Sequence, residues 1–563
     1  MRLTLLLLLG AGACTRPDAG QKGADAAAAV VEMQAPVLPL AEVARAIRRA
    51  VDSVEASHER LTVRDRETVA HVYGESGYLP VWLTANGGLR GVAEDALALL
   101  RQSADEGLRP ADYDVAVLDS VSGRIASGGP PVVDDIARFE AVLTLAVSRY
   151  LGDLHDGRVD PRRVGFHLQA NMDPHQIVFL LSSALSEGSL TVVARDLAPR
   201  LPQYGGLRAV LPKYRELAAA PEETIPELAA LAPGDSSLGV AAIRRRLIRL
   251  GDLAPGEERD SSRYDSVLVA GVRSFQDRHG LEADGVIGRE TLAELRVPLS
   301  WRVRQIEFAL ERLRWIPDLG AGPLVLVNIP MFELSAWDSV TPTATPSFRT
   351  GVIVGKALDT ETPVLLEEMR YLIFRPYWNV PRSILRDEVL PAIRRDPGYL
   401  REQDMEIVQG EGDRPAILAQ TPQNLALLAA GRLRVRQRPG PSNALGLVKF
   451  IFPNDVNVYL HGTPAVQLFD TARRDFSHGC VRVEEPARLA EFVLRDQPEW
   501  TPTRIAAAMH AAVSRRVDLR QPLPVLLFYS TATARPDGTV RFARDIYGHD
   551  GRLDVALQGR GDR

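Results

Sequence analysis

The chain has 563 residues, which is long enough for three or more domains of ordinary size. Hydrophobic residues make up 45% of it and charged residues 25%, as in a globular protein with a sizeable core. The formal net charge of -5 at pH 7, spread over this length, argues against nucleic acid as the main partner.

The first residues are typical of a secretory signal. Met1 and Arg2 precede an apolar run over residues 3–9, which is too short for a bilayer that takes about 20 residues to span. Two processing routes remain open: ordinary cleavage after Ala13, or cleavage that leaves Cys14 as a lipidated N-terminus, although Ala11 stands where a lipobox usually carries Leu. We expect residues 1–13 to be a signal peptide and the protein to be exported to the periplasm or cell envelope, with a lipid anchor if the second route holds.

Residues 14–39 are rich in Ala, Gly, Asp and Pro, which predicts a flexible tether. Lipidation of Cys14 removes it from disulfide chemistry. Cys480 is then the sole remaining thiol of an exported protein, and an unpaired cysteine in an oxidising compartment indicates reactivity.

Residues 40–235 have mostly helical patterns. Apolar spacing predicts amphipathic helices over 93–102, 136–150 and 177–185, with Gly- and Pro-containing turns at 107–110 and 157–161. This part contains no pair of nucleophile and base and no ligand cluster. We therefore predict a helical scaffold domain.

Residues 236–297 form a compact unit with three short apolar stripes, typical of three small helices. A turn with Asp284 and Gly285 precedes the last of them. His279 lies just before this turn, where a surface position is a better interpretation than a ligand.

From residue 298 onward the pattern becomes rich in strands after one more helix. Buried strands are predicted over 324–330, 351–355, 371–374 and 448–452, so residues 298–563 are interpreted as a mainly β catalytic domain. An insertion at 382–433 turns helical again, over 384–395 and 422–430. Insertions of this length are often lids, and a structural embellishment is the alternative.

The richest chemistry lies in His461-Gly462-Thr463 and in the run from Ser477 to Arg482. A cysteine enzyme usually needs a histidine to take the thiol proton, because a free thiol has a pKa near ~8.5. The alternation of residues 456–461 predicts a half-buried strand that carries Tyr459 and His461 on its polar face.

Gly479 allows close approach of the backbone, so the amides of Gly479 and Cys480 could bind an oxyanion. If the chain continues as a strand, Arg482 shares a face with Cys480 and could hold a substrate carboxylate. Two alternatives remain open at this point: a buried structural thiol, or a zinc site that also uses His478 and His461. The absence of a second Cys or His pair in the sequence weakens the zinc site, and no metal or cofactor is expected.

The C-terminal part predicts a hairpin within 523–550. Its strands would be Val525–Tyr529 and Val540–Phe542, joined through an Asp537-Gly538 turn. No catalytic constellation accompanies this hairpin.

The two motifs together resemble the signature of the YkuD-type L,D-transpeptidases. This resemblance implies that Cys480 is the nucleophile and His461 the base, oriented by the backbone carbonyl of Gly462. The remaining site residues that it implies are Ser477, His478, Gly479 and Tyr459 for the oxyanion and positioning, and Arg482 and Trp378 for substrate binding.

Other segments also resemble this family. Residues 78–82, 107–113, 377–383 and 436–446 are similar to the large, YcbB-like class, and residues 275–291 are similar to small peptidoglycan-binding domains. The implied fold is multidomain α+β: a helical scaffold, a three-helix peptidoglycan-binding domain, and a mainly β YkuD-like catalytic domain whose helical insertion caps the substrate groove.

The implied activity is the formation of 3→3 peptidoglycan cross-links through a cysteine acyl-enzyme on tetrapeptide stems, with release of D-alanine. The expected partners are stem peptides and glycan, with acylation by carbapenems and without nucleic acid. Two alternatives stay open: an L,D-carboxypeptidase or cross-link hydrolase that uses water as the acceptor, and a non-catalytic peptidoglycan-binding scaffold.

Overall fold

The computed structural model describes residues 38–56, 63–127, 132–168, 174–256, 262–357, 360–410, 412 and 415–559. The predicted signal peptide, Cys14 and the tether up to residue 37 lie outside these ranges, so export and lipidation stay predictions. Within these ranges, no helix combines the length and the apolar character that a membrane span requires.

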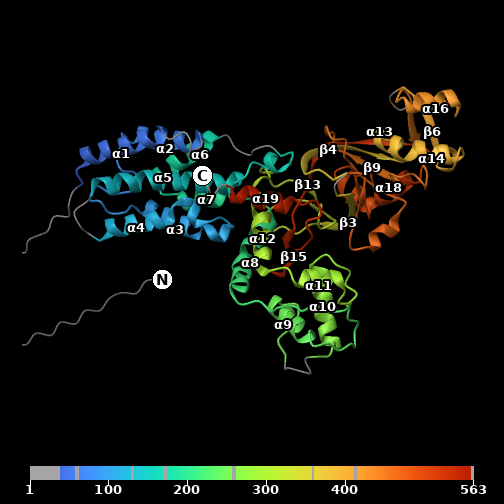
Figure 1. Cartoon of the computed structure of the whole chain (residues 1–563). Helices are drawn as coiled ribbons and strands as arrows, with labels where there is room; N and C mark the ends of the chain where they lie inside the picture. Colours follow the sequence, from blue (N-terminus) through green and yellow to red (C-terminus); the bar gives the residue numbers. More distant parts are fainter. Residues whose placement is uncertain are drawn as a thin grey trace, which may run out of the picture.

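The N-terminal part is a helical bundle at one end of the molecule (Figure 1). Its helices are α1 (Leu40–Ala56), α2 (Val63–Glu75), α3 (Gly91–Arg101), α4 (Val115–Ala126), α5 (Val133–Asp156), α6 (Pro174–Glu187) and α7 (Leu190–Leu197). The next helix, α8 (Pro202–Ala219), lies outside this bundle and packs mainly against α12 (Leu299–Arg314). Short 3₁₀ turns lie at Gln102–Glu106, Pro110–Tyr113 and Pro161–Val164. Helix α5 is the centre of the bundle, because its buried residues occupy more than one face.

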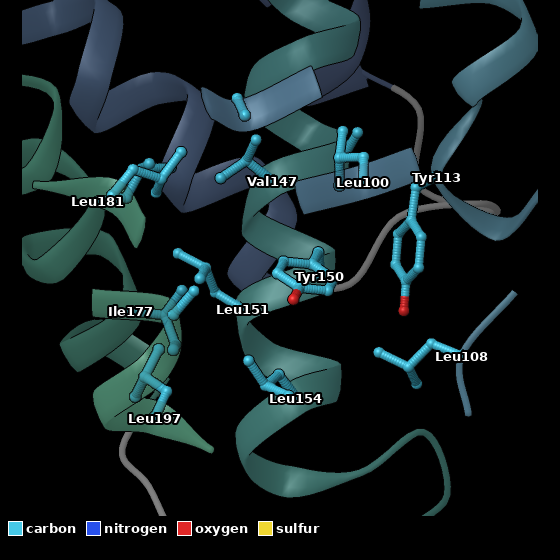
Figure 2. Packing of buried hydrophobic residues seen from close by; sticks show 14 of the residues in the cluster. Leu100, Leu108, Tyr113, Val147, Tyr150, Leu151, Leu154, Ile177, Leu181 and Leu197 are labelled. Atoms are coloured by element: carbon cyan, nitrogen blue, oxygen red, sulfur yellow. The ribbon is translucent and has the colours of Figure 1, made fainter. Parts of the chain in front are cut away.

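Figure 2 shows this bundle core. Side chains of α5 such as Val147, Leu151 and Leu154 face Ile177 and Leu181 of α6, and all of them are buried.

A buried carboxylate fixes the 78–82 segment to this bundle. Glu140 of α5 accepts hydrogen bonds from the Tyr73 hydroxyl at 2.9 Å and from the backbone N–H groups of Val81 and Trp82 at 2.9 and 3.1 Å. Burial raises the pKa of Glu140 to about 7. These donors offset the cost of desolvating the carboxyl group.

The small unit predicted at residues 236–297 consists of α9 (Val240–Leu250), α10 (Ser266–Arg278) and α11 (Arg289–Leu295), packed around their own apolar cluster. Asp265 caps α10 by accepting the Leu268 N–H at 2.8 Å. The prediction of a surface position for His279 is wrong. Its ring is buried and stacks on Phe275 with 3.8 Å between centroids, and Phe542 of the C-terminal hairpin covers it.

Helix α12 (Leu299–Arg314) connects the parts of the molecule. It packs against α8 and against the last helix, α19 (His549–Gln558). Arg312 of α12 forms a fully buried ion pair with Asp550 of α19 at 2.5 Å. Scaffold residues between Val159 and Leu168 are also buried in the core of the catalytic domain, so the domains share packing.

The catalytic domain is built on one large sheet. Within the described residues its strand order is β11-β3-β12-β10-β9-β4-β13-β1-β2, and β2 also pairs with β3. This last pairing closes eight strands into a continuous hydrogen-bonded path. The strands are β1 (Leu324–Asn328), β2 (Glu333–Trp337), β3 (Phe348–Gly355), β4 (Leu365–Phe374), β9 (Val448–Ile451), β10 (Leu460–His461), β11 (Asp475–Ser477), β12 (Val481–Val483) and β13 (Arg515–Phe528).

Two helices complete the core of this domain. Apolar residues of α17 (Pro486–Val493) and α18 (Pro502–Met509) belong to the same buried cluster as the strands. A 3₁₀ turn at Val466–Asp470 leads toward β11.

The insertion lies at the opposite end of the molecule from the scaffold (Figure 1). Its helical parts are α13 (Arg382–Ile384), a π-helical turn (Leu385–Val389), α14 (Leu390–Arg395), α15 (Tyr399–Glu402) and α16 (Pro422–Ala429). A sheet of order β5-β8-β6-β7 extends the insertion beyond the predicted bounds of 382–433. Strands β6 (Met405–Gln409) and β7 (Ala416–Leu418) lie within these bounds, and β5 (Trp378–Asn379) and β8 (Arg434–Gln437) lie just outside them. The sequence pattern predicted the helices but not this sheet, whose strands have only two to five residues.

The C-terminal hairpin differs from the prediction in its first strand. It consists of β14 (Ala532–Ala534) and β15 (Val540–Phe542) around the Asp537-Gly538 turn, where Gly538 has a φ of 78°. Val525–Phe528 instead belong to β13 and pair in parallel with β1. A fully apolar run suits a central strand of the large sheet better than a surface hairpin.

The buried ion pair predicts a large stability effect. Asp550→Ala leaves the Arg312 guanidinium buried without its partner, so we expect a loss of about 3–5 kcal/mol in unfolding free energy. Urea denaturation followed by tryptophan fluorescence measures this loss. Asp387→Ala, which removes the exposed partner of Arg386, is the matched control and should leave the midpoint unchanged. An equal midpoint for the two variants would contradict the structural role of the buried pair.

Candidate active site

Three neighbouring strands bring His461 and Arg482 side by side on one face of the sheet. Strand β10 lies between β9 and β12, and His461 is paired directly with Lys449 on one side and with Arg482 on the other. Directly paired residues project to the same face of a sheet. The polar row Lys449–His461–Arg482 therefore lies on one face, and Leu460 beside it is buried in the core on the other.

Strand β10 is shorter than predicted. Only Leu460 and His461 are in strand conformation, and Asn457 has a φ of 56°. The Asn454 side chain bonds to both backbone groups of Val458, at 3.1 Å and 2.8 Å, and so replaces the ladder bonds there. The alternating pattern was correct for His461 but wrong for the loop before it.

His461 is held by one backbone hydrogen bond. Its Nδ1 lies 2.5 Å from the Gly462 carbonyl oxygen. Because a carbonyl can only accept, Nδ1 carries the proton and Nε2 keeps its lone pair. Burial lowers the pKa of His461 to about 3, the Gly462 carbonyl opposes this, and Arg482 and Lys449 lower it further. The imidazole is therefore neutral at physiological pH.

Cys480 lies half-buried just before β12. Its sulfur is 3.9 Å from the Asn457 carbonyl oxygen, within hydrogen-bonding reach for a thiol. Burial raises the pKa of the thiol, and the backbone N–H and hydroxyl of Tyr459 lower it in part, as do Lys449 and Arg482. The resting site thus holds a thiol and a neutral imidazole, not an ion pair.

The turn before Cys480 has its own hydrogen bonds. Gly479 has a φ of 106°, which an L-residue rarely adopts. Its N–H donates to Ser477 Oγ at 3.2 Å, and Ser477 Oγ donates to the Cys480 carbonyl at 2.5 Å. The Gly479 amide is therefore already engaged, and of the two amides predicted for the oxyanion, that of Cys480 remains as the candidate.

His478 faces the insertion. Its Nε2 lies 2.7 Å from Oε1 of Glu388, and both side chains are partly exposed. Glu388 belongs to the π-helical turn at Leu385–Val389, and such turns are often found at functional sites. This contact joins the insertion to the loop that carries Cys480.

The two residues predicted for substrate binding occupy different places. Arg482 is half-buried beside His461, and burial lowers the pKa of its guanidinium while Cys480 opposes this. Trp378 lies at the root of the insertion and packs against the apolar core of the insertion.

The residues that support this loop were not among the predicted site residues. Gly355 ends β3 and donates its N–H to Thr362 Oγ1 at 2.9 Å, and Thr362 Oγ1 donates to the Gly479 carbonyl at 2.8 Å. The Tyr547 hydroxyl donates to the Gly355 carbonyl at 2.6 Å. A glycine at the end of a predicted buried strand was the available signal.

Lys449 is also a residue that the pattern alone did not single out. It was part of the predicted strand 448–452, and only strand pairing reveals that it lies beside His461. In the part of the chain that the structure describes, no group of three His, Cys, Asp or Glu side chains could hold a metal ion.

Comparison with known families agrees with this geometry. Residues 323–505 match the L,D-transpeptidase catalytic domain model (YkuD), residues 236–295 match the "Putative peptidoglycan binding domain" model, and residues 67–211 match a scaffold domain model. The chain contains a YkuD L,D-transpeptidase catalytic domain and a peptidoglycan-binding domain. This domain order is consistent with the YcbB-like class.

Among curated proteins, the chain is similar to a "Putative L,D-transpeptidase" of Haemophilus influenzae. The two are 33% identical over 249 residues, which cover 44% of this chain and 48% of the relative. The chain therefore matches about half the length of this relative. A crystal structure of the L,D-transpeptidase of Xylanimonas cellulosilytica (residues 123–326) covers 54% of this chain and 99% of its own, with 16% identity and a TM-score of 0.16, which is too low to add to the family match.

The packing around Gly355 predicts a strong effect on the site. In Gly355→Ala the new Cβ would lie 1.8 Å from the Thr360 carbonyl oxygen and 3.0 Å from Gly479 Cα. The loop must move, and we expect the carbapenem acylation predicted for Cys480 to slow by roughly 100-fold, as for misplacements of about 1 Å. Mass spectrometry of the adduct over time measures this rate.

Gly322→Ala is the matched control, since nothing lies within 4 Å of its Cβ. It should react like the parent protein. Equal acylation rates for Gly355→Ala and the parent would show that the Thr360–Gly479 packing does not position the cysteine.

Proposed function

We propose that this protein is an L,D-transpeptidase that forms 3→3 cross-links in peptidoglycan, with Cys480 as nucleophile and His461 as base. The observation that carries the proposal is a neutral imidazole, held at Nδ1 by Gly462, on a strand whose neighbour begins directly after Cys480 in a YkuD domain. The match to an L,D-transpeptidase catalytic domain supports the reaction class.

In the first step, the sulfur of Cys480 attacks the carbonyl on the L-centre of the third stem residue. His461 Nε2 takes the thiol proton as the S–C bond forms, because the resting site holds no thiolate. The C–N bond to the terminal D-alanine then breaks, and the imidazolium returns the proton to the leaving amine. The products of this step are a thioester and free D-alanine.

The oxyanion of this step needs donors on the side of Cys480. The Cys480 amide and the Tyr459 hydroxyl are the proposed donors, because Tyr459 already acts on the sulfur and the Gly479 amide is engaged by Ser477. Arg482 is proposed to hold a stem carboxylate from its place beside His461.

In the second step, the side-chain amine of another stem attacks the thioester. His461 takes the proton of the amine, the new C–N bond forms, and the C–S bond breaks. The sulfur recovers its proton from the imidazolium, which regenerates the resting thiol.

The insertion and the small helical domain are proposed to act on the same polymer. The contact between His478 and Glu388 supports a lid over the acceptor and donor stems, and residues 236–295 are proposed to hold the glycan. Export to the cell envelope, with Cys14 as a lipid anchor, fits this substrate and rests on residues 1–14 alone.

The activity is tested with the purified protein and disaccharide tetrapeptides. We expect 3→3 cross-linked dimers and free D-alanine, and neither product with Cys480→Ala. Liquid chromatography with mass spectrometry identifies both products. Tripeptides without dimers would replace the proposal with an L,D-carboxypeptidase, and binding to peptidoglycan without any product would replace it with a scaffold.

A carbapenem gives an independent test of the nucleophile. The ring-opened drug should add its mass to the parent protein at Cys480 and should not add to Cys480→Ala. Peptide mapping locates the adduct, and an adduct on the alanine variant would exclude Cys480 as the acylated residue.

A further inference from the structure

Lys449 is a basic residue at the site for which the reaction above has no role. It lies on β9, directly opposite His461 of β10, with Ile373 of β4 on its other side. Its side chain is half-buried. Among the described residues no carboxylate forms an ion pair with its ammonium group, which is uncommon for a lysine removed from water.

The ammonium group of Lys449 contacts Tyr459 instead. Its Nζ lies 3.6 Å from the centroid of the Tyr459 ring, within the range of a cation–π interaction. Tyr459 in turn interacts with the Cys480 sulfur through its backbone N–H and its hydroxyl. Lys449, Tyr459 and Cys480 thus form one connected cluster.

The Tyr459 phenol donates a hydrogen bond to the sulfur and keeps its proton. Burial raises the pKa of its phenol, and the Cys480 thiolate raises it further. A cation on the ring face draws electron density from the ring and strengthens the O–H as a donor. The positive charge therefore acts on the sulfur both directly and through the phenol.

We propose that Lys449 is a positioning residue for the thiolate: its ammonium, stacked on Tyr459, stabilises the negative charge on Cys480 that develops when His461 removes the thiol proton. This role adds a residue to the mechanism of the transpeptidase proposed above, and its biological meaning rests on that proposed function. It makes Lys449 a thiolate-stabilising residue that touches neither substrate nor acceptor.

The charged and titratable groups around Lys449 fix the expected pH dependence. They are Cys480, Tyr459, His461 and Arg482. Burial lowers the pKa of Lys449 to about 8, and Cys480 opposes this. The ammonium charge is therefore present below about pH 8 and is lost above it. The ammonium therefore stabilises the thiolate at neutral pH, and this stabilisation is lost as the pH rises through 8.

The test is the pH dependence of Cys480 alkylation by iodoacetamide, which needs no peptidoglycan. Lys449→Met should slow alkylation about tenfold at pH 7, where the parent carries the ammonium charge, as expected for loss of a nearby opposite charge. Lys449→Arg should restore most of the rate. Lys213→Met, an exposed lysine of α8, is the matched control and should behave like the parent.

The parent protein provides an independent measurement, which does not depend on whether the variants fold. Its alkylation profile should contain an inflection near pH 8 from Lys449 in addition to that of the thiol. With disaccharide tetrapeptides, Lys449→Met should lower kcat for D-alanine release and leave KM nearly unchanged.

An unchanged alkylation rate at pH 7 in a folded Lys449→Met would overturn the proposal. So would a loss of rate that Lys449→Arg fails to reverse, since packing alone would then explain it, or a parent profile without the inflection. If the parent alkylates as expected but forms no muropeptide product, the proposed transpeptidase fails while the thiolate role of Lys449 stands.

Discussion

The hydrogen bond from His461 Nδ1 to the Gly462 carbonyl is the interaction on which the site depends. It fixes the tautomer, so that Nε2 presents a lone pair without a carboxylate partner. Burial and the flanking cations Lys449 and Arg482 keep the ring neutral. The same cations lower the pKa of the Cys480 thiol, although burial outweighs them and the net shift is upward. The site therefore keeps the base neutral at rest and offsets part of the cost of the negative charge that forms on the sulfur during attack.

The rest of the fold holds this arrangement in place. Pairing of β2 with β3 closes the sheet. The closed sheet fixes the register of β9, β10 and β12, and so keeps Lys449, His461 and Arg482 side by side. The loop before Cys480 is supported from behind by Gly355 and Thr362, and it is contacted from outside by Glu388 of the insertion. Helix α12 connects this domain to the scaffold through a shared core.

Much of the architecture could be predicted from the sequence, because helix and strand periodicity follow from which faces are buried. The helices of the scaffold and the strands around 324–355 are examples. The sheet in the insertion could not, since its short strands alternate too briefly to give a pattern. The contacts of His461 with Lys449 and Arg482 could not be predicted either, because only long-range strand pairing brings these residues together. His279 was misjudged since a hairpin from the far C-terminus covers it.

The most direct test of this account is the protonation state of His461 in the full-length protein. Selective isotope labelling of histidine and an NMR titration, with His461→Gln to assign the signal, report both its pKa and its tautomer. We predict a neutral ring protonated at Nδ1 from pH 8 down to about pH 4, in line with a pKa of about 3. A ring that gains a second proton near pH 6.5, the usual value for histidine, or that carries its proton on Nε2, would contradict the account.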